Sequence, residues 1–61
     1  MKNIDEPKLK AFRARLIEAQ AELVGRAAES PGLPSSNELR KIADIESAIG
    51  AVEALLDGAK P

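Results

Sequence analysis

The chain has 61 residues, no cysteine, no histidine and one aromatic residue, Phe12, and its net charge is −1. These absences exclude disulfide bonds, the usual zinc sites, and catalysis by an imidazole or a thiolate. The balanced charge is not typical of a general nucleic-acid binder, and no apolar run approaches the roughly 18 residues of a membrane span. We therefore expect a soluble cytoplasmic protein that is not an enzyme and has no cofactor or metal.

A first long helix is predicted over about residues 6–29, where Ala, Leu, Glu, Lys and Arg predominate. Asp5 is a suitable N-cap residue for this helix. Pro7 falls in the first turn, where the missing backbone N–H breaks no helical hydrogen bond. The start of the first helix is therefore well defined by the sequence.

A loop over about residues 30–35 follows, because two prolines and a glycine within five residues cannot continue a helix. A second helix is predicted over about residues 36–57. Ser35 and Glu38 have the spacing of a capping box at its start. Gly58 is a suitable residue for the position just after its end.

Two helices of similar length joined by a short loop predict an antiparallel hairpin. We expect an all-α fold and a single helical-hairpin domain over residues 1–61. A domain of this size is only marginally stable without disulfides, a metal or oligomerisation. Since the sequence offers neither a disulfide nor a usual zinc site, oligomerisation is the expected source of additional stability.

The apolar residues of the second helix follow a heptad pattern. Ile42, Ile45, Ile49, Val52 and Leu56 are separated by 3, 4, 3 and 4 residues. This is the spacing of the buried seam in a coiled coil or helical bundle.

The first helix carries two apolar stripes. A single partner helix needs an apolar arc of only about 100°, so one stripe remains for a second contact. One stripe contains Leu9, Phe12, Leu16, Ala19, Leu23 and Ala27, and the other contains Ala14, Ile17, Ala21, Val24 and Ala28.

We expect the second stripe to support self-association, with two hairpins forming a four-helix bundle as a homodimer or higher oligomer. The alternative is that this stripe binds a different protein. The residues expected in the core or at the oligomer interface are Leu9, Phe12, Leu16, Ile17, Leu23, Val24, Ile42, Ile45, Ile49, Val52 and Leu56.

Small residues also recur at helical spacing on both helices. Gly50 is costly inside a helix, which is consistent with close approach by another helix, although exposure on the surface is the alternative. The residues expected to permit such close packing are Ala14, Ala21, Ala28, Ala43, Ser47, Gly50 and Ala54.

The charged residues are interpreted first as structural. In an antiparallel hairpin, Lys10 and Arg13 lie near Glu53 and Asp57, at the end of the second helix. The alternative is a basic patch that binds phosphates. Within the first helix, Glu22 and Arg26 have the spacing of a favourable i,i+4 ion pair.

The loop is the best candidate for contact with an outside partner, because loops carry function more often than packed faces do. Leu33, between Gly32 and Pro34, is the candidate contact residue. The alternative, which we favour from the sequence, is a hydrophobic staple in which Leu33 or Pro34 folds over Leu39.

Residues 9–16, 39–42, 45–49 and 56–58 resemble the coiled-coil hairpin of the DksA/TraR-type regulators of bacterial RNA polymerase. This resemblance implies a helical hairpin directed at RNA polymerase. The chain departs from that family because it has no cysteine for a zinc finger and no acidic residue in its turn. Rop-type RNA modulators share only the expected architecture of two hairpins in a bundle.

The leading functional interpretation is a small scaffold, adaptor or regulator that acts by binding protein. Its expected partners are a second copy of the chain and another protein. Neither a membrane nor nucleic acid is an expected partner in this interpretation. The alternative is a nucleic-acid-binding or RNA-polymerase-directed transcription regulator.

Overall fold

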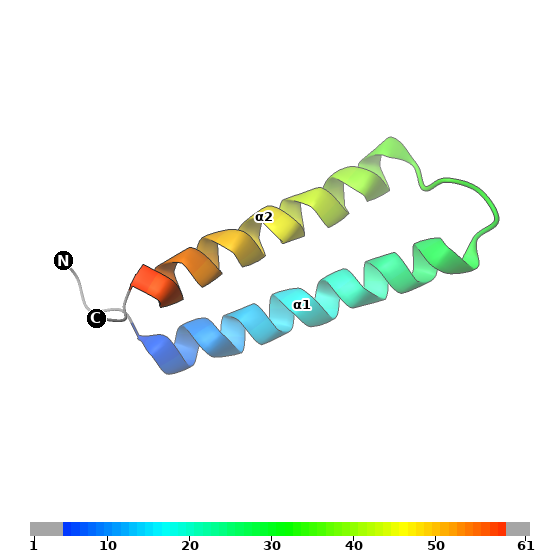
Figure 1. Cartoon of the computed structure of the whole chain (residues 1–61). Helices are drawn as coiled ribbons and strands as arrows, with labels where there is room; N and C mark the ends of the chain where they lie inside the picture. The colour runs from blue at the N-terminus through cyan, green and yellow to red at the C-terminus, as the bar shows by residue number, and fades with distance from the viewer. Residues whose placement is uncertain (1–4, 59–61) are drawn as a thin grey trace.

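The computed structural model describes residues 5–58. It contains α1 (Glu6–Glu29) and α2 (Ser36–Gly58), which are joined by a loop over residues 30–35. The two helices pack side by side in opposite directions (Figure 1). The prediction of an all-α antiparallel hairpin is therefore confirmed.

Both helix starts are capped by side chains, as the sequence predicted. The Lys8 N–H donates to Asp5 Oδ1 at 3.1 Å at the start of α1. At the start of α2, the Glu38 N–H donates to Ser35 Oγ at 3.2 Å, and the Ser35 N–H donates to Glu38 Oε1 at 3.2 Å. These bonds satisfy backbone donors that the helices leave free at their first turns.

The two helices end differently. After Glu29, Ser30 has an extended backbone, and its N–H donates to the Ala27 carbonyl at 3.2 Å. Gly58 is the last residue of α2, not the residue after it, so that part of the prediction is wrong. No glycine in residues 5–58 has a positive φ. Gly58 therefore keeps the right-handed helical conformation, which glycine also adopts.

The inner face of α2 is the heptad seam that the sequence predicted. Ile49 and Val52 are 7% and 5% exposed, and they are the only buried hydrophobic residues in the part of the chain that the structure describes. The remaining seam residues, Ile42, Ile45 and Leu56, are half-buried. The core is therefore one thin layer between two helices.

The inner face of α1 differs from the predicted stripe at two positions. Arg13 and Gln20 are half-buried, whereas Phe12 and Ala19 are exposed. The prediction followed only apolar residues, but these two polar side chains reach acceptors on α2. The residues that face α2 are Glu6, Leu9, Arg13, Leu16, Gln20, Leu23 and Ala27, in heptad spacing.

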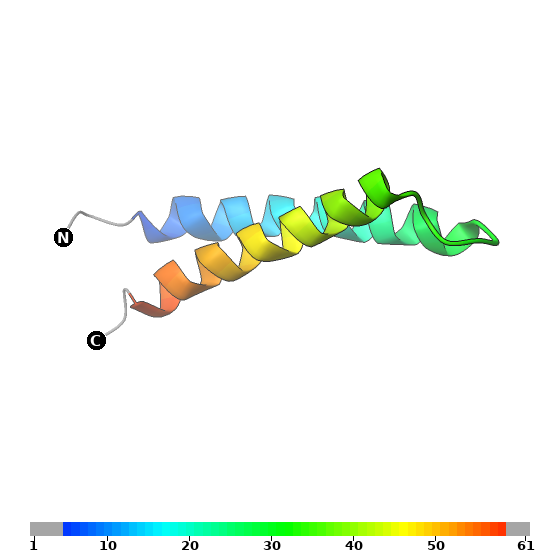
Figure 2. The ribbon, with the colours of Figure 1, turned by 90° about the horizontal axis from the view of Figure 1, so that it is seen from above.

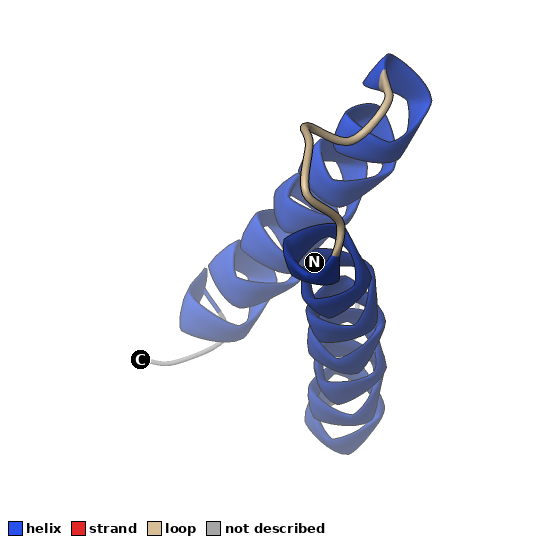
Figure 3. Cartoon of the chain, turned by 90° about the vertical axis from the view of Figure 1, so that its right-hand side faces the viewer, coloured by secondary structure: helices blue, strands red, loops and turns tan. Residues whose placement is uncertain are grey.

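The hairpin is elongated, with extents of 46 × 17 × 15 Å. Its radius of gyration is 14.3 Å, whereas a compact chain of this length has about 10.5 Å. The helices cross at an angle (Figure 2), and the view from the loop end shows them inclined to one another (Figure 3). Large areas of both helices therefore remain uncovered.

Candidate functional site

Two polar contacts run along one border between the helices. Arg13 Nε donates to Glu53 Oε2 at 2.9 Å, and Gln20 Nε2 donates to Glu46 Oε1 at 2.8 Å. The step of seven residues from Arg13 to Gln20 is matched by seven residues back from Glu53 to Glu46. This match sets the register of the two antiparallel helices on that side of the hairpin.

The sequence anticipated only part of this border. Arg13 lies beside Glu53 as expected, but Lys10 and Asp57 form no ion pair in the described part of the chain. The contact between Gln20 and Glu46 was missed, although the heptad spacing from Leu9 through Arg13 and Leu16 to Gln20 could have indicated it. Both inner positions are polar and therefore lie outside the apolar stripes of α1.

The second apolar stripe of α1 is exposed along its whole length. We call this surface the outer seam. At 100° per residue, it lies roughly 90° around α1 from the inner face. A helix in a four-helix bundle has its two neighbours in about this arrangement. The outer seam consists of Ala14, Ile17, Ala21, Val24 and Ala28.

The outer seam contains two large side chains that the hairpin leaves without cover. Ile17 is 40% exposed and Val24 is 47% exposed. Ile17 and Val24 lie one helical turn after Arg13 and Gln20, next to the polar border. No charged residue interrupts the seam between Ala14 and Ala28. The geometry makes the outer seam the strongest candidate for an interaction surface.

A second, smaller apolar surface lies on the opposite side of the hairpin. Helical periodicity places Phe12 and Leu55 there, and both are exposed. The Arg15 guanidinium lies 5.5 Å from the centre of the Phe12 ring. This cation–π contact covers part of the ring within the same helix.

The seven small residues expected to permit close packing do not line the contact between α1 and α2. All seven are exposed, and a Cβ atom added at Gly50 would meet nothing within 4 Å. Close packing of these residues within the hairpin is therefore absent. Whether a second chain packs against them stays a prediction. The residues concerned are Ala14, Ala21, Ala28, Ala43, Ser47, Gly50 and Ala54.

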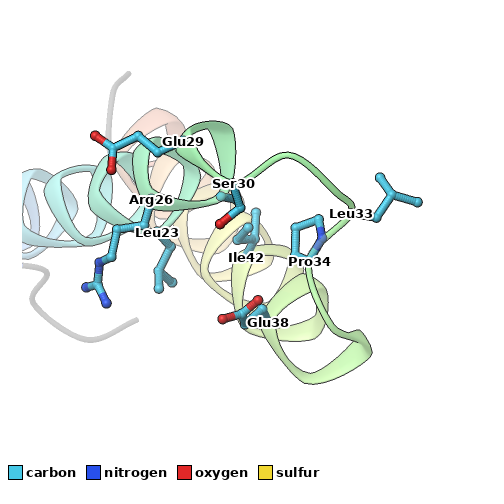
Figure 4. A pocket seen from close by; sticks show the side chains of 9 residues that line it. Leu23, Arg26, Glu29, Ser30, Leu33, Pro34, Glu38 and Ile42 are labelled. Carbon is cyan, nitrogen blue, oxygen red and sulfur yellow. The ribbon is translucent and has the colours of Figure 1, made fainter.

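A groove of about 510 Å³ lies at the loop end of the hairpin (Figure 4). Leu23 and Ala27 of α1 line one side, and Ile42 of α2 and Pro34 of the loop line the other. All four are half-buried. The rim carries Arg26, Glu29, Ser30, Leu33 and Glu38.

Leu33 points away from the groove (Figure 4) and is 92% exposed. The favoured expectation was that Leu33 or Pro34 folds over Leu39. For Leu33 it is wrong, whereas for Pro34 it stays a prediction, and Leu39 is itself 47% exposed. Pro34, which follows Leu33, is the loop residue that turns inward. The candidate contact residue for a partner is thus freely accessible at the tip of the hairpin.

The basic residues near the start of α1 are partly neutralised. Lys8 Nζ lies 3.9 Å from Asp5 Oδ2, and Arg13 is paired with Glu53. Glu22 and Arg26 do not form their predicted ion pair in the described structure. Both side chains are exposed, so water competes effectively for each of them.

Within residues 5–58, no group of three or more acidic side chains is placed to hold a metal ion. The described helices include none that is long and apolar enough to cross a membrane. Comparisons of the chain with protein-family models, curated proteins and solved structures gave no match.

Proposed function

We propose that the chain is a small, non-enzymatic interaction module that self-associates through its lateral apolar surfaces and acts as a scaffold, adaptor or regulator. One observation carries this proposal. Among residues 5–58, only two apolar residues are buried, whereas six large apolar residues are exposed. They are Phe12, Ile17, Val24, Leu33, Leu39 and Leu55.

Stability arguments support self-association. A two-helix chain without disulfides has too small a core for more than marginal stability. Covering the exposed half of Ile17 or Val24 contributes about 1 kcal/mol for each side chain, estimated from the transfer free energy of a fully buried residue. In a twofold-symmetric dimer every such contact occurs twice. Two hairpins arranged as a four-helix bundle would bury these side chains together.

Sedimentation equilibrium at micromolar concentration tests this proposal. We expect a dimer or larger species, and a thermal midpoint that rises with concentration because association stabilises the folded state. Detection should use interference optics, since the chain has no Trp or Tyr. A cooperatively folded monomer whose midpoint is independent of concentration would contradict the proposal.

The tip of the hairpin is the proposed contact with a different protein. Leu33 is the most exposed large apolar residue in the described part of the chain. The loop that contains it lies at the end of the hairpin farthest from the start of α1 (Figure 1). Lateral self-association leaves this end accessible. A single chain could then use its sides for assembly and its tip for a partner.

A second candidate function is regulation of RNA polymerase or binding of nucleic acid. The antiparallel helical hairpin with an exposed tip favours this candidate. The pairing of Arg13 with Glu53 disfavours it, because that charge is less available to a phosphate. A gel shift with RNA and DNA at several salt concentrations distinguishes the two functions. Tight, salt-sensitive binding that is lost in a variant lacking both Lys10 and Arg13 would favour nucleic acid.

A further inference from the structure

We propose that a second copy of this chain docks on the outer seam with the two α1 helices antiparallel, so that Ile17 of each copy packs against Ala21 of the other. This inference rests on the proposed self-association. It specifies the surface and the orientation that the dimer uses.

The alternation of residue sizes along the outer seam favours the antiparallel orientation. Small and large residues alternate from Ala14 through Ile17, Ala21 and Val24 to Ala28. In an antiparallel helix pair, Ile17 lies level with Ala21 of the other copy, and Ala14 lies level with Val24. Every layer then contains one large and one small side chain, which permits uniform packing.

A parallel pair has no such complementarity. Equivalent residues would face each other, so Ile17 would meet Ile17 and Ala21 would meet Ala21. Overpacked layers would alternate with layers that contain a cavity, and both overpacking and cavities destabilise an interface.

The charges of α1 favour the same orientation. From Lys8 to Arg15 the charged residues are all basic, whereas Glu18 to Glu29 contains three acidic residues and one basic residue. Antiparallel packing places the basic half of each helix along the acidic half of the other. Parallel packing places like charges together, which is unfavourable.

Lys10 provides a specific orientation signal. It precedes Ala14 by four residues and therefore continues the spacing of the outer seam. In the antiparallel pair Lys10 lies level with Ala28 of the other copy, beside Glu29 and the C-terminal end of α1. A cation is favoured at that end of a helix. In the parallel pair, Lys10 would lie beside Lys10 of the other copy.

The polar side chains at the border of the outer seam are already hydrogen-bonded within the hairpin. Arg13 and Gln20 already have partners in Glu53 and Glu46, so a second copy does not leave these polar groups unpaired. On the opposite surface, Arg15 covers part of Phe12. The outer seam is therefore the better surface for a second helix.

Single cysteines introduced into this cysteine-free chain test the orientation. We expect a short thiol-specific cross-linker to join Ala14→Cys to Val24→Cys when the two variants are refolded together. Each variant alone should give little product, because its two thiols lie about 15 Å apart along the helix axis at 1.5 Å per residue. Ala51→Cys, on the exposed side of α2, is the control for random collision.

Sedimentation of the same samples separates failure of this inference from failure of the proposed function. Efficient cross-linking of Ala14→Cys alone would show a parallel pair and overturn the inference. A dimer that gives no more mixed product than the Ala51→Cys control would show that another surface is used. A folded monomer would overturn both proposals. Circular dichroism establishes beforehand that each variant retains the helical content of the parent.

Discussion

Arg13 and Glu53 lie 40 residues apart in the sequence and are joined by a hydrogen bond of 2.9 Å from Nε to Oε2. Their side chains remain 42% and 47% exposed. Water and salt therefore screen the charges, and the pair acts mainly to set the register between α1 and α2.

Removing this pair should lower stability only slightly. In a double-mutant cycle with Arg13→Ala and Glu53→Ala, we expect a coupling free energy of about 0.2–1 kcal/mol. Urea unfolding monitored by circular dichroism measures it. Lys10 and Asp57, which form no ion pair in the structure, provide a matched control cycle with coupling near zero. Equal coupling in both cycles would contradict the role assigned to Arg13 and Glu53.

A charge placed in the core of the hairpin should unfold it. Ile49 is 7% exposed, and Ile49→Asp would bury a carboxylate without a partner. We expect loss of most of the helical circular dichroism signal at room temperature. Ala51→Asp, two residues along on the exposed side of α2, should lose less than about 0.7 kcal/mol from helix propensity alone. Similar behaviour of the two variants would show that Ile49 does not lie in the core.

The features that sequence predicted well are local ones. The breakers in residues 30–35 and the caps at Asp5 and Ser35 act within a few residues, and the structure confirms them. The core seam of α2 was also evident, because every position in it is apolar.

The features that the sequence did not predict depend on which side of each helix faces the other. Arg13 and Gln20 occupy inner positions only because Glu53 and Glu46 lie opposite them across the hairpin. The position of Leu33 depends on the path of the loop between two prolines, and periodicity carries no information about that path. The inner face of α1 and the direction of Leu33 therefore required the structure.

The capping box at α2 should contribute measurably to stability. Ser35→Ala removes the hydroxyl that accepts the Glu38 N–H, and we expect a loss of about 1 kcal/mol. Thermal melts at a fixed concentration measure the effect. Ser36→Ala, at the next position, is the control because Ser36 makes no capping bond in the described structure. Equal losses for both variants would mean that the capping bonds do not stabilise the helix.

Gly50 should be replaceable by alanine with a gain in stability. The glycine is exposed, and an added Cβ meets nothing within 4 Å in the hairpin. We expect Gly50→Ala to stabilise α2 by up to about 1 kcal/mol, because glycine has poor helix propensity. Gly50→Leu provides the sterically demanding comparison. If the leucine variant lowers the sedimentation mass of the assembly, a second chain approaches α2 at this position.

Leu33 should contribute little to folding. Because it is 92% exposed, Leu33→Ser should change the free energy of unfolding by less than about 0.5 kcal/mol. Ile42→Ser is the matched control at the same end of the hairpin, since Ile42 is half-buried and lines the groove. The free energy of unfolding of that control should fall by more than about 1 kcal/mol, because the substitution leaves a cavity and partly buries a hydroxyl group. Urea unfolding compares the variants, and sedimentation should show the same oligomeric state for Leu33→Ser as for the parent. A loss of stability as large as that of Ile42→Ser would mean that Leu33 packs within the assembly, and the tip would then no longer be a free surface for a partner.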